Sequence, residues 1–378
     1  MIEGASWLGV LVLEKKFDIR YRPSLPTKLS ARHQKTLSGF LKNKYDLTGF
    51  SAELGWTVKP NANAKKGLYV TNSKGIRAKR EYSLTPPADK TRITTFGDSY
   101  TFGMEVKNED TWQEQLGELN NSLEVLNFGI GGHAPDQGYL RYLGEGAKYS
   151  ADIVVIGFMS ENINRIVNVY RPYYTELTGL PLTKPRFIVE NNSLKLIKNP
   201  FQRLSDYQVL FDQPESVLPK LGKHDYYFHT RYAKHPLDVL RTVRLVKMAN
   251  YDLLKKRTYD QQGSYNENSE GYQLLLVLLD TFYNKVKESG AEPVILIYPD
   301  FGDVIRLYSG KPKKYQLLLD WLQTKQYAHV DLMDSIQKYK KDNKVDNFFV
   351  KAHGHYSRAG NGFVAHQVNT YINDTYRK

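Results

Sequence analysis

Short apolar segments alternate with helical patterns along residues 92–378, and this alternation limits the folds open to the chain. The expected strands are Ile93–Phe96, Val125–Phe128, Ile153–Phe158, Val294–Tyr298 and Val330–Met333. The expected helices are Asp110–Leu119, Gln137–Tyr149, Tyr272–Glu288, Tyr315–Thr324 and Gly360–Tyr371. Strands that alternate with helices form parallel sheets covered by helices. The sequence therefore predicts an α/β domain with a central parallel sheet over residues 91–378.

Two stretches depart from this alternation. Residues 1–90 are rich in Pro, Asn, Gly and Lys, which predicts a β-rich or irregular N-terminal extension. Within it, the apolar run Ala5–Leu13 suits a buried strand, an interfacial segment or the stub of a removed anchor, and is too short to span a bilayer. Residues 163–268 predict an insertion into the α/β domain, with a hairpin over Phe187–Ile197 and a long helix over Pro236–Arg257.

Charge and cysteine content narrow the chemistry and the partners. The chain of 378 residues carries a net charge of +13, spread over small basic clusters, and contains no cysteine. Thiolate catalysis, disulfides and cysteine-ligated metals are therefore excluded. No nucleic-acid-binding motif accompanies the basic clusters, so an acidic glycan, an anionic membrane surface or plain solubility explains them at least as well as nucleic acid does. We expect no nucleic-acid partner.

Four candidate site residues follow one another at matching places in this pattern. Ser99 follows the first expected strand in "FGDSYTFG", Gly132 follows the second in "NFGIGGHA", and Asn162 follows the third in "SEN". His355 lies ahead of the final expected helix, in "GHYSRAGN". Because the carboxyl ends of parallel strands meet at one edge of a sheet, these residues are expected to lie together.

The four residue types suit acyl transfer by a serine. His355 is the candidate base that takes the proton of Ser99. The backbone N–H groups of Ser99 and Gly132, with the side-chain amide of Asn162, are the candidate donors of an oxyanion hole. Asp98 is expected to cap a helix rather than to catalyse.

Three further residues are candidate substrate contacts: His353, His133 and Tyr100. For His353 an ordinary surface position is the first interpretation, and a weak stand-in for a catalytic acid is a third. We expect no metal site, because the histidines lack the helical pair spacing of zinc ligands, and we expect no cofactor.

The four blocks resemble the SGNH (GDSL-type) hydrolase superfamily, which is named for its Ser, Gly, Asn and His. The resemblance covers about Thr91 to the C-terminus and matches the family residues to the four positions above. It implies a flavodoxin-like three-layer α/β/α sandwich, and members that cleave or transfer acyl groups, frequently on sugars. Residues Asp46–Arg80 resemble the N-terminal extension of some bacterial members.

Two blocks depart from the family pattern. Ser160 and Ile163 replace a glycine and an aspartate of the third block. In the last block, Ala352 and His353 stand where a carboxylate usually precedes the histidine. That carboxylate orients the imidazole, and loss of its charge costs about four decades in rate in a related triad.

The missing acid leaves three interpretations open. Ser99 and His355 can work as a dyad, with a backbone carbonyl orienting the ring. A carboxylate from elsewhere can fill the place, and the candidates, in order, are Asp346, Asp136 and Glu161. Alternatively, the site binds a glycan or an acyl group without turning it over.

The sequence therefore predicts a serine esterase that removes acyl groups, chiefly O-acetyl groups, from a carbohydrate. The partner is expected to be an acylated glycan, either neutral or anionic, with peripheral membrane association as a further option. An O-acyltransferase acting on a polysaccharide, or a catalytically weakened glycan-binding protein, is the alternative. The compartment, bacterial cytoplasm or cell envelope, is not determined by the sequence.

Overall fold

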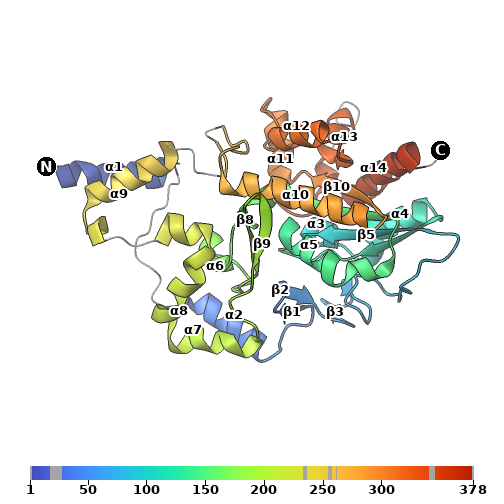
Figure 1. Cartoon of the computed structure of the whole chain (residues 1–378), viewed down its shortest axis with the longest axis horizontal. Helices are drawn as coiled ribbons and strands as arrows, with labels where there is room; N and C mark the ends of the chain where they lie inside the picture. The colour runs from blue at the N-terminus through green and yellow to red at the C-terminus, as the bar shows by residue number, and fades with distance from the viewer. Residues whose placement is uncertain are drawn as a thin grey trace. The chain divides into compact units, whose positions relative to one another are not determined.

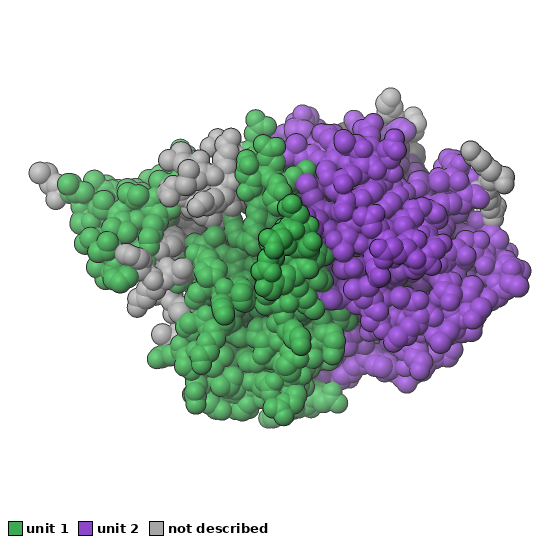
Figure 2. Space-filling model, in the orientation of Figure 1, with its two compact units in different colours: residues 1–44, 50–56, 164–274 green, residues 45–49, 57–163, 275–378 purple. Residues whose placement is uncertain are grey.

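The computed structural model describes residues 2–17, 28–232, 236–253, 258–260, 262–339 and 345–376. The chain forms two compact units, coloured separately in Figure 2. The insertion unit comprises residues 1–44, 50–56 and 164–274, and the sheet unit comprises residues 45–49, 57–163 and 275–378. These boundaries differ from the division expected at residue 90, because most of residues 57–90 pack with the sheet. The expected insertion at 163–268 lies close to the long segment of the insertion unit.

Parallel strands form the central sheet of the sheet unit. They are β5 (Thr91–Gly97), β6 (Leu123–Asn127), β7 (Ile153–Met159), β10 (Glu292–Tyr298) and β11 (His329–Asp331). Their order in space is β6-β5-β7-β10-β11, and each neighbouring pair is parallel. Counted along the chain, this is the 2-1-3-4-5 order of flavodoxin-like folds. Figure 1 labels β5 and β10 of this sheet. The predicted fold class is confirmed, and β5 and β7 flank the point at which such sheets bind ligands.

Helices cover both faces of this sheet. Those that flank it include α4 (Trp112–Leu119), α5 (Pro135–Gly144), α10 (Glu270–Glu288) and α14 (Arg358–Tyr376). Thr95 of β5 accepts a hydrogen bond from Gln113 of α4 at 3.0 Å, while the ring of Phe96 packs against Tyr142 of α5. Successive side chains of a strand point to opposite faces, so α4 and α5 cover opposite faces. α14 packs with α4, and Phe282 of α10 packs with Tyr142 of α5, which completes three layers.

Glycines let the strand ends of the sheet unit approach closely. Gly97 ends β5 with a φ of +155°, and its register partner on β7 is Gly157. A Cβ on Gly97 would lie 2.1 Å from the carbonyl oxygen of Gly157 and 2.3 Å from Oγ1 of Thr101. Only glycine fits there, immediately before the Asp98–Ser99 turn.

Smaller elements surround the sheet. They are α3 (Ser99–Phe102), α11 (Phe301–Tyr308), α12 (Gln316–Thr324), α13 (Leu332–Tyr339), β3 (Asn63–Ala64) and β4 (Tyr69–Val70). Strand β1 (Thr48–Ser51) pairs with β2 (Gly55–Val58), and β3 pairs with β4. The C-terminal expected strand ends early, because the Asp331 side chain accepts the backbone N–H of Met333 and starts α13 there.

The insertion unit is largely helical. Its helices are α1 (Ile2–Phe17), α2 (Ala31–Leu41), α6 (Arg171–Tyr174), α7 (Val209–Asp212), α8 (Pro214–Leu221) and α9 (Arg241–Leu253). The expected hairpin is confirmed as β8 (Arg186–Glu190) and β9 (Ser193–Ile197). Its turn residues Asn191 and Asn192 have φ values of 52° and 58°, as two-residue hairpin turns require.

Two helical segments correct expectations for this unit. The run Ala5–Leu13 lies inside α1, so its interpretation as a strand is wrong; its residues meet α9 at helical spacing. The helix expected over Pro236–Arg257 is a 3₁₀ turn, Pro236–Val239, followed by α9, and residues 254–257 lie outside the described residues. Among the described residues, no helix is both long and apolar enough to cross a membrane.

The close approach at Gly97 predicts that substitution by alanine has opposite effects on stability at Gly97 and at Gly117. Gly97→Ala should lower the free energy of unfolding by about 3 kcal/mol or more, because the new methyl group meets backbone rather than a movable side chain. Gly117 lies within α4, and a Cβ there meets nothing within 4 Å. Gly117→Ala should therefore raise the free energy of unfolding by about 0.5–1 kcal/mol. Urea denaturation measures both, and equal effects would contradict the packing described at β5 and β7.

Candidate functional site

Ser99 lies at the carboxyl end of β5, as the first residue of α3. Asp98 precedes it as the helix cap, and its Oδ1 accepts the backbone N–H of Tyr100 at 2.8 Å. The short helix ends at Gly103, which is left-handed with φ of +76°. This tight turn holds Ser99 largely buried, with 8% of its surface exposed.

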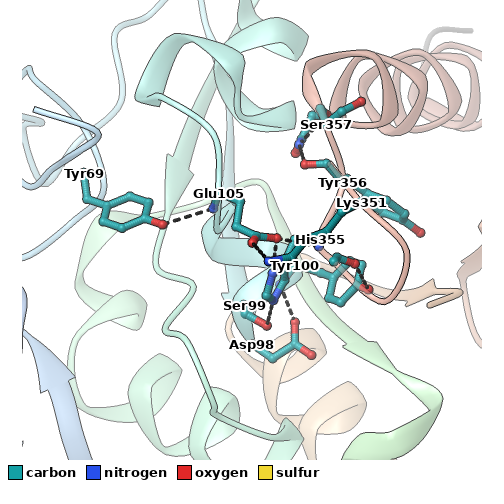
Figure 3. Close-up of polar contacts among 12 residues, drawn as sticks. Tyr69, Asp98, Ser99, Tyr100, Glu105, Lys351, His355, Tyr356 and Ser357 are labelled. Atoms are coloured by element: carbon teal, nitrogen blue, oxygen red, sulfur yellow. Dashed lines mark hydrogen bonds and ion pairs between the residues drawn. The ribbon is translucent and has the colours of Figure 1, made fainter. Parts of the chain in front are cut away.

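A chain of hydrogen bonds connects Ser99, His355 and Glu105 (Figure 3). Ser99 Oγ lies 2.8 Å from His355 Nε2, and Glu105 Oε2 lies 3.1 Å from His355 Nδ1. The backbone N–H of His355 donates to the same Glu105 oxygen at 2.8 Å. In the tautomer that suits a base, Nδ1–H donates to Glu105 and Nε2 accepts the hydroxyl proton of Ser99.

Glu105 occupies the place for which the sequence analysis expected another carboxylate. Asp136 lies at the start of α5, where its Oδ1 accepts the backbone N–H of Gln137, and Glu161 lies in the 3₁₀ turn after β7. The backbone of Asp346 belongs to the turn Val345–Phe348, and its side chain lies outside the described residues. Glu105 was missed because it is 250 residues from His355 and outside the last block.

Glu105 is held in an unfavourable backbone conformation. Its φ is +70°, in the left-handed region that side chains other than those of Asn and Asp rarely adopt. Such strain costs of order 1–3 kcal/mol and persists where the surroundings over-determine the conformation. The surroundings of the loop Phe102–Asn108 therefore matter for the position of this carboxylate.

A buried arginine supplies those surroundings. The guanidinium of Arg77 donates hydrogen bonds to carbonyl oxygens of the loop, those of Phe102, Gly103 and Val106. Its Nε also donates to Asn108 Oδ1 at 3.3 Å. Burial lowers the pKa of Arg77, which is 2% exposed, yet the guanidinium has acceptors on every side.

Tyr69 fixes the same loop at Glu105 itself. The backbone N–H of Glu105 donates to the Tyr69 hydroxyl at 3.1 Å (Figure 3). The rings of Tyr69 and Phe102 lie 5.0 and 4.3 Å from the Arg77 guanidinium. Tyr69 and Arg77 come from the segment expected to be an extension, so that segment forms part of the frame of the site.

Contacts with His355 lower the pKa of Glu105. Partial burial acts in the opposite direction, but hydrogen bonds from the His355 backbone and ring, and the charges of His355 and Lys351, outweigh it. Lys351 Nζ lies 3.5 Å from Glu105 Oε1. A lowered pKa means that Glu105 stabilises the folded protein above its unfolded pKa of about 4.3, and that this contribution is lost as the pH falls further. The carboxylate is thus ionised at neutral pH.

The expected oxyanion-hole residues follow neighbouring strands. Asn162 is fully buried after β7, and its Nδ2 donates to Asp98 Oδ2 at 2.6 Å. An amide nitrogen carries two hydrogens, so this bond orients the group and leaves one donor. Gly132 lies in the loop after β6 with φ of +83°, a conformation that favours glycine.

The three expected substrate contacts differ in exposure. Tyr100 is 5% exposed, packs its ring 5.2 Å from that of His355 and donates to the Gly354 carbonyl. His133 is fully buried. His353 has a left-handed φ of +58° and lies edge-on to Phe301. Tyr100 therefore packs against the imidazole ring of His355. His133 has no exposed surface with which to contact a large substrate.

An open groove of about 830 Å³ adjoins the acid side of the site. Glu105 lines it together with the rings of Phe301 and Phe349. Cationic side chains from Lys107, Lys351 and Arg358 also line it. Its volume is that of an ordinary ligand site.

No family model and no curated protein matches this sequence. Solved structures to which it is similar include a protein assigned to the G-D-S-L family of lipolytic proteins from Desulfitobacterium hafniense (11% identity, 75% of this chain and 99% of that chain, TM-score 0.38). Another is a lipase/acylhydrolase from Enterococcus faecalis (12% identity, 75% of this chain and 95% of that chain, TM-score 0.37). A third is a catalytic mutant of an acetylxylan esterase from Geobacillus stearothermophilus (12% identity, 75% of this chain and 94% of that chain, TM-score 0.37).

Replacing the Glu105 charge should lower turnover strongly. For Glu105→Gln we expect kcat for ester hydrolysis to fall by about two to four decades, because the imidazolium loses its counter-charge. The acid limb of the pH profile should also move to lower pH. Glu109→Gln is the control, since that carboxylate is half exposed and pairs with Lys79 at 3.4 Å, away from His355. A fall below threefold for Glu105→Gln, or an equal fall for both variants, would contradict the geometry.

The hydrogen bonds from Arg77 to the loop of Glu105 predict that substitution of Arg77 lowers kcat through Glu105. Lysine cannot donate to several carbonyls in a fixed fork, so Arg77→Lys should lower kcat by about 10–100-fold through misplacement of Glu105. In a Glu105→Gln background the same substitution should change kcat little, although its stability loss persists. Arg80→Lys serves as the control because Arg80 pairs with Glu114 on the surface. Additive losses in kcat would show that Arg77 acts on the reaction independently of Glu105.

Proposed function

We propose that this protein is a serine esterase that removes O-acetyl groups from a carbohydrate. The observation that carries the proposal is the hydrogen-bond chain in which Ser99 Oγ lies 2.8 Å from His355 Nε2 and Glu105 lies at Nδ1. Nucleophile, base and orienting acid thus stand in the relation that serine acyl transfer needs. Ser99 is the proposed nucleophile, His355 the base and Glu105 the positioning acid.

In the first half-reaction, Ser99 Oγ attacks the carbonyl carbon of the acetyl ester while its proton passes to His355 Nε2. The oxygen of the tetrahedral intermediate takes the negative charge, and the N–H groups of Ser99 and Gly132 and the Asn162 amide are its proposed donors. The ester C–O bond then breaks. His355 returns the proton to the departing sugar oxygen, which leaves as a hydroxyl group, and the acetyl group stays on Ser99.

In the second half-reaction, water attacks the acetyl-serine ester. His355 takes a proton from the water, and the C–O bond to Ser99 breaks after the second tetrahedral intermediate. His355 gives its proton to Ser99 Oγ, and acetate leaves. Glu105 stabilises the imidazolium in both halves and stays ionised, which its lowered pKa supports.

The carbohydrate part of the proposal rests on the resemblance of the four sequence blocks and on the groove beside Glu105. Aromatic rings such as those of Phe301 and Phe349 suit the apolar faces of sugars, and Lys107, Lys351 and Arg358 suit an acidic glycan. An O-acyltransferase would use the same acetyl-serine intermediate with a sugar hydroxyl in place of water. The alternative of a catalytically weakened glycan-binding protein was raised because the orienting acid was missing from the last block. A carboxylate at His355 Nδ1 removes that reason.

A serine-directed fluorophosphonate tests the proposed nucleophile. We expect the wild-type protein to be labelled at Ser99 and Ser99→Ala to remain unlabelled. His355→Ala should reduce labelling by at least about two decades, since the hydroxyl then lacks its base. Ser357→Ala controls for a half-buried hydroxyl near the site that lies outside the Ser99–His355–Glu105 chain. Absence of labelling in a folded wild-type protein would refute the esterase proposal.

Product analysis then separates hydrolysis from transfer. Acetate release from acetylated xylan, with no acetyl group gained by an added glycan, supports the esterase. Transfer that exceeds acetate release would identify the acyltransferase. Activity on an aryl acetate but on no acetylated glycan would retain the mechanism and reject the carbohydrate substrate.

A further inference from the structure

Within the insertion unit, α1 and α9 lie side by side and run in the same direction (Figure 1). The Glu3 carboxylate accepts the first backbone N–H groups of α9, those of Arg241 at 2.7 Å and Thr242 at 3.2 Å. Further along, Val10 and Met248 form a small buried cluster. Contacts from Glu3 to Arg241 and from Val10 to Met248 advance together along both helices, so the pair is parallel.

The inner side of this pair already has its partners. Leu13 and Leu245 pack around the Val10–Met248 cluster, and a Cβ on Gly9 would lie 2.9 Å from the Leu245 side chain. Ser6 and Thr242 share a hydrogen bond of 2.9 Å. Nothing in the helix–helix contact therefore needs the apolar side chains on the outside.

Large exposed apolar side chains are concentrated on the surface of this helix pair. Of the nineteen large apolar side chains that are exposed in the described residues, eight belong to α1 or to the segment 237–246. They are Ile2, Trp7, Leu8, Val12, Leu237, Val239, Leu240 and Val246, which we call the α1–α9 face. Exposure reaches 83% for Val239 and 74% for Ile2. Such concentration marks an interaction surface rather than ordinary scatter.

In α1 and in residues 236–253, cations slightly outnumber acids: they are Lys15, Lys16, Arg241, Arg244 and Lys247 against Glu3, Glu14, Asp238 and Asp252. Lys15 and Lys16 end α1, and Arg241 lies 5.8 Å from the Trp7 ring. Two of the acidic groups are already engaged within the pair. Glu3 caps α9, and Asp238 pairs with Lys247 at 2.7 Å. A second copy of the face would bring these cations against one another, whereas an anionic surface complements them.

We propose that the α1–α9 face binds the surface of a membrane that contains anionic lipid. The aliphatic side chains and the Trp7 ring enter the boundary between headgroups and acyl chains, and the lysines and arginine meet lipid phosphates. Tryptophan suits this depth because its ring is apolar with one polar N–H. The face has no residue in the proposed catalytic site, so the proposal stands independently of the esterase.

Vesicle flotation of the full chain tests this surface. Vesicles of phosphatidylcholine with phosphatidylserine should bind the protein at low salt, and vesicles of phosphatidylcholine alone should bind it at least tenfold less tightly. Leu8→Glu and Val239→Glu should each weaken binding at least about tenfold, because a carboxylate replaces a side chain that enters the apolar region. Leu177→Glu is the matched control, since Leu177 is 76% exposed in the same unit but outside the face.

A second pair of variants tests the electrostatic part. Lys15→Glu with Lys16→Glu should weaken binding about twentyfold or more, from about fivefold for each lysine lost near an anionic surface. Lys220→Glu with Lys223→Glu makes the same charge change elsewhere in the unit and should have little effect. Thermal unfolding checks each variant, and Val239→Glu, in a 3₁₀ turn, provides the test if Leu8→Glu does not fold.

Three results would overturn the proposal. One is failure of the wild type to float with anionic vesicles. Another is equal binding by the face variants and their controls. The third is a dimer in sedimentation equilibrium that Leu8→Glu abolishes while vesicles remain unbound, which would assign the face to a second copy. None depends on esterase activity, so a failed esterase assay and a failed flotation are distinguishable.

Discussion

The hydrogen bond between Ser99 Oγ and His355 Nε2 is the contact on which the proposed chemistry depends, and it joins residues 256 positions apart. Ser99 is placed by the end of β5, where Gly97 meets Gly157 of β7 with no room for a Cβ. His355 is placed from the opposite end of the domain sequence, just before α14. A parallel sheet brings these ends together because successive strands finish at the same edge.

The carboxylate beside the His355 imidazole comes from a loop close to Ser99 in the sequence rather than from the segment before His355. Glu105 follows the nucleophile's own helix and reaches His355 from a left-handed backbone position. Arg77 and Tyr69 hold that loop by bonding to its backbone. A buried guanidinium without a carboxylate at hydrogen-bond distance is costly, and here loop carbonyls offset the cost. Part of the N-terminal segment thus serves the geometry of the site.

Sequence reasoning succeeded where local pattern and sheet topology together fix position. Ser99, Gly132 and Asn162 each follow a strand that the apolar pattern marks, and the hairpin at Asn191 follows from the turn residues. It failed where a role depends on contacts made between distant loops. Glu105 has no local signal for its role, since Arg77 and Tyr69, which lie well before it in the chain, hold the backbone of its loop. The run Ala5–Leu13 misled similarly, because its helix packs against α9.

The sequence alone determined the α/β class, the expected edge of the sheet and the candidate serine and histidine, because strand period, turn residues and residue type are local properties. Tertiary structure decided which carboxylate meets His355 Nδ1, that residues 57–90 belong with the sheet, and that α1 and α9 share one exposed apolar face. These depend on distances between segments far apart in the chain. Such distances are set by packing as a whole and are not encoded in any short stretch of residues.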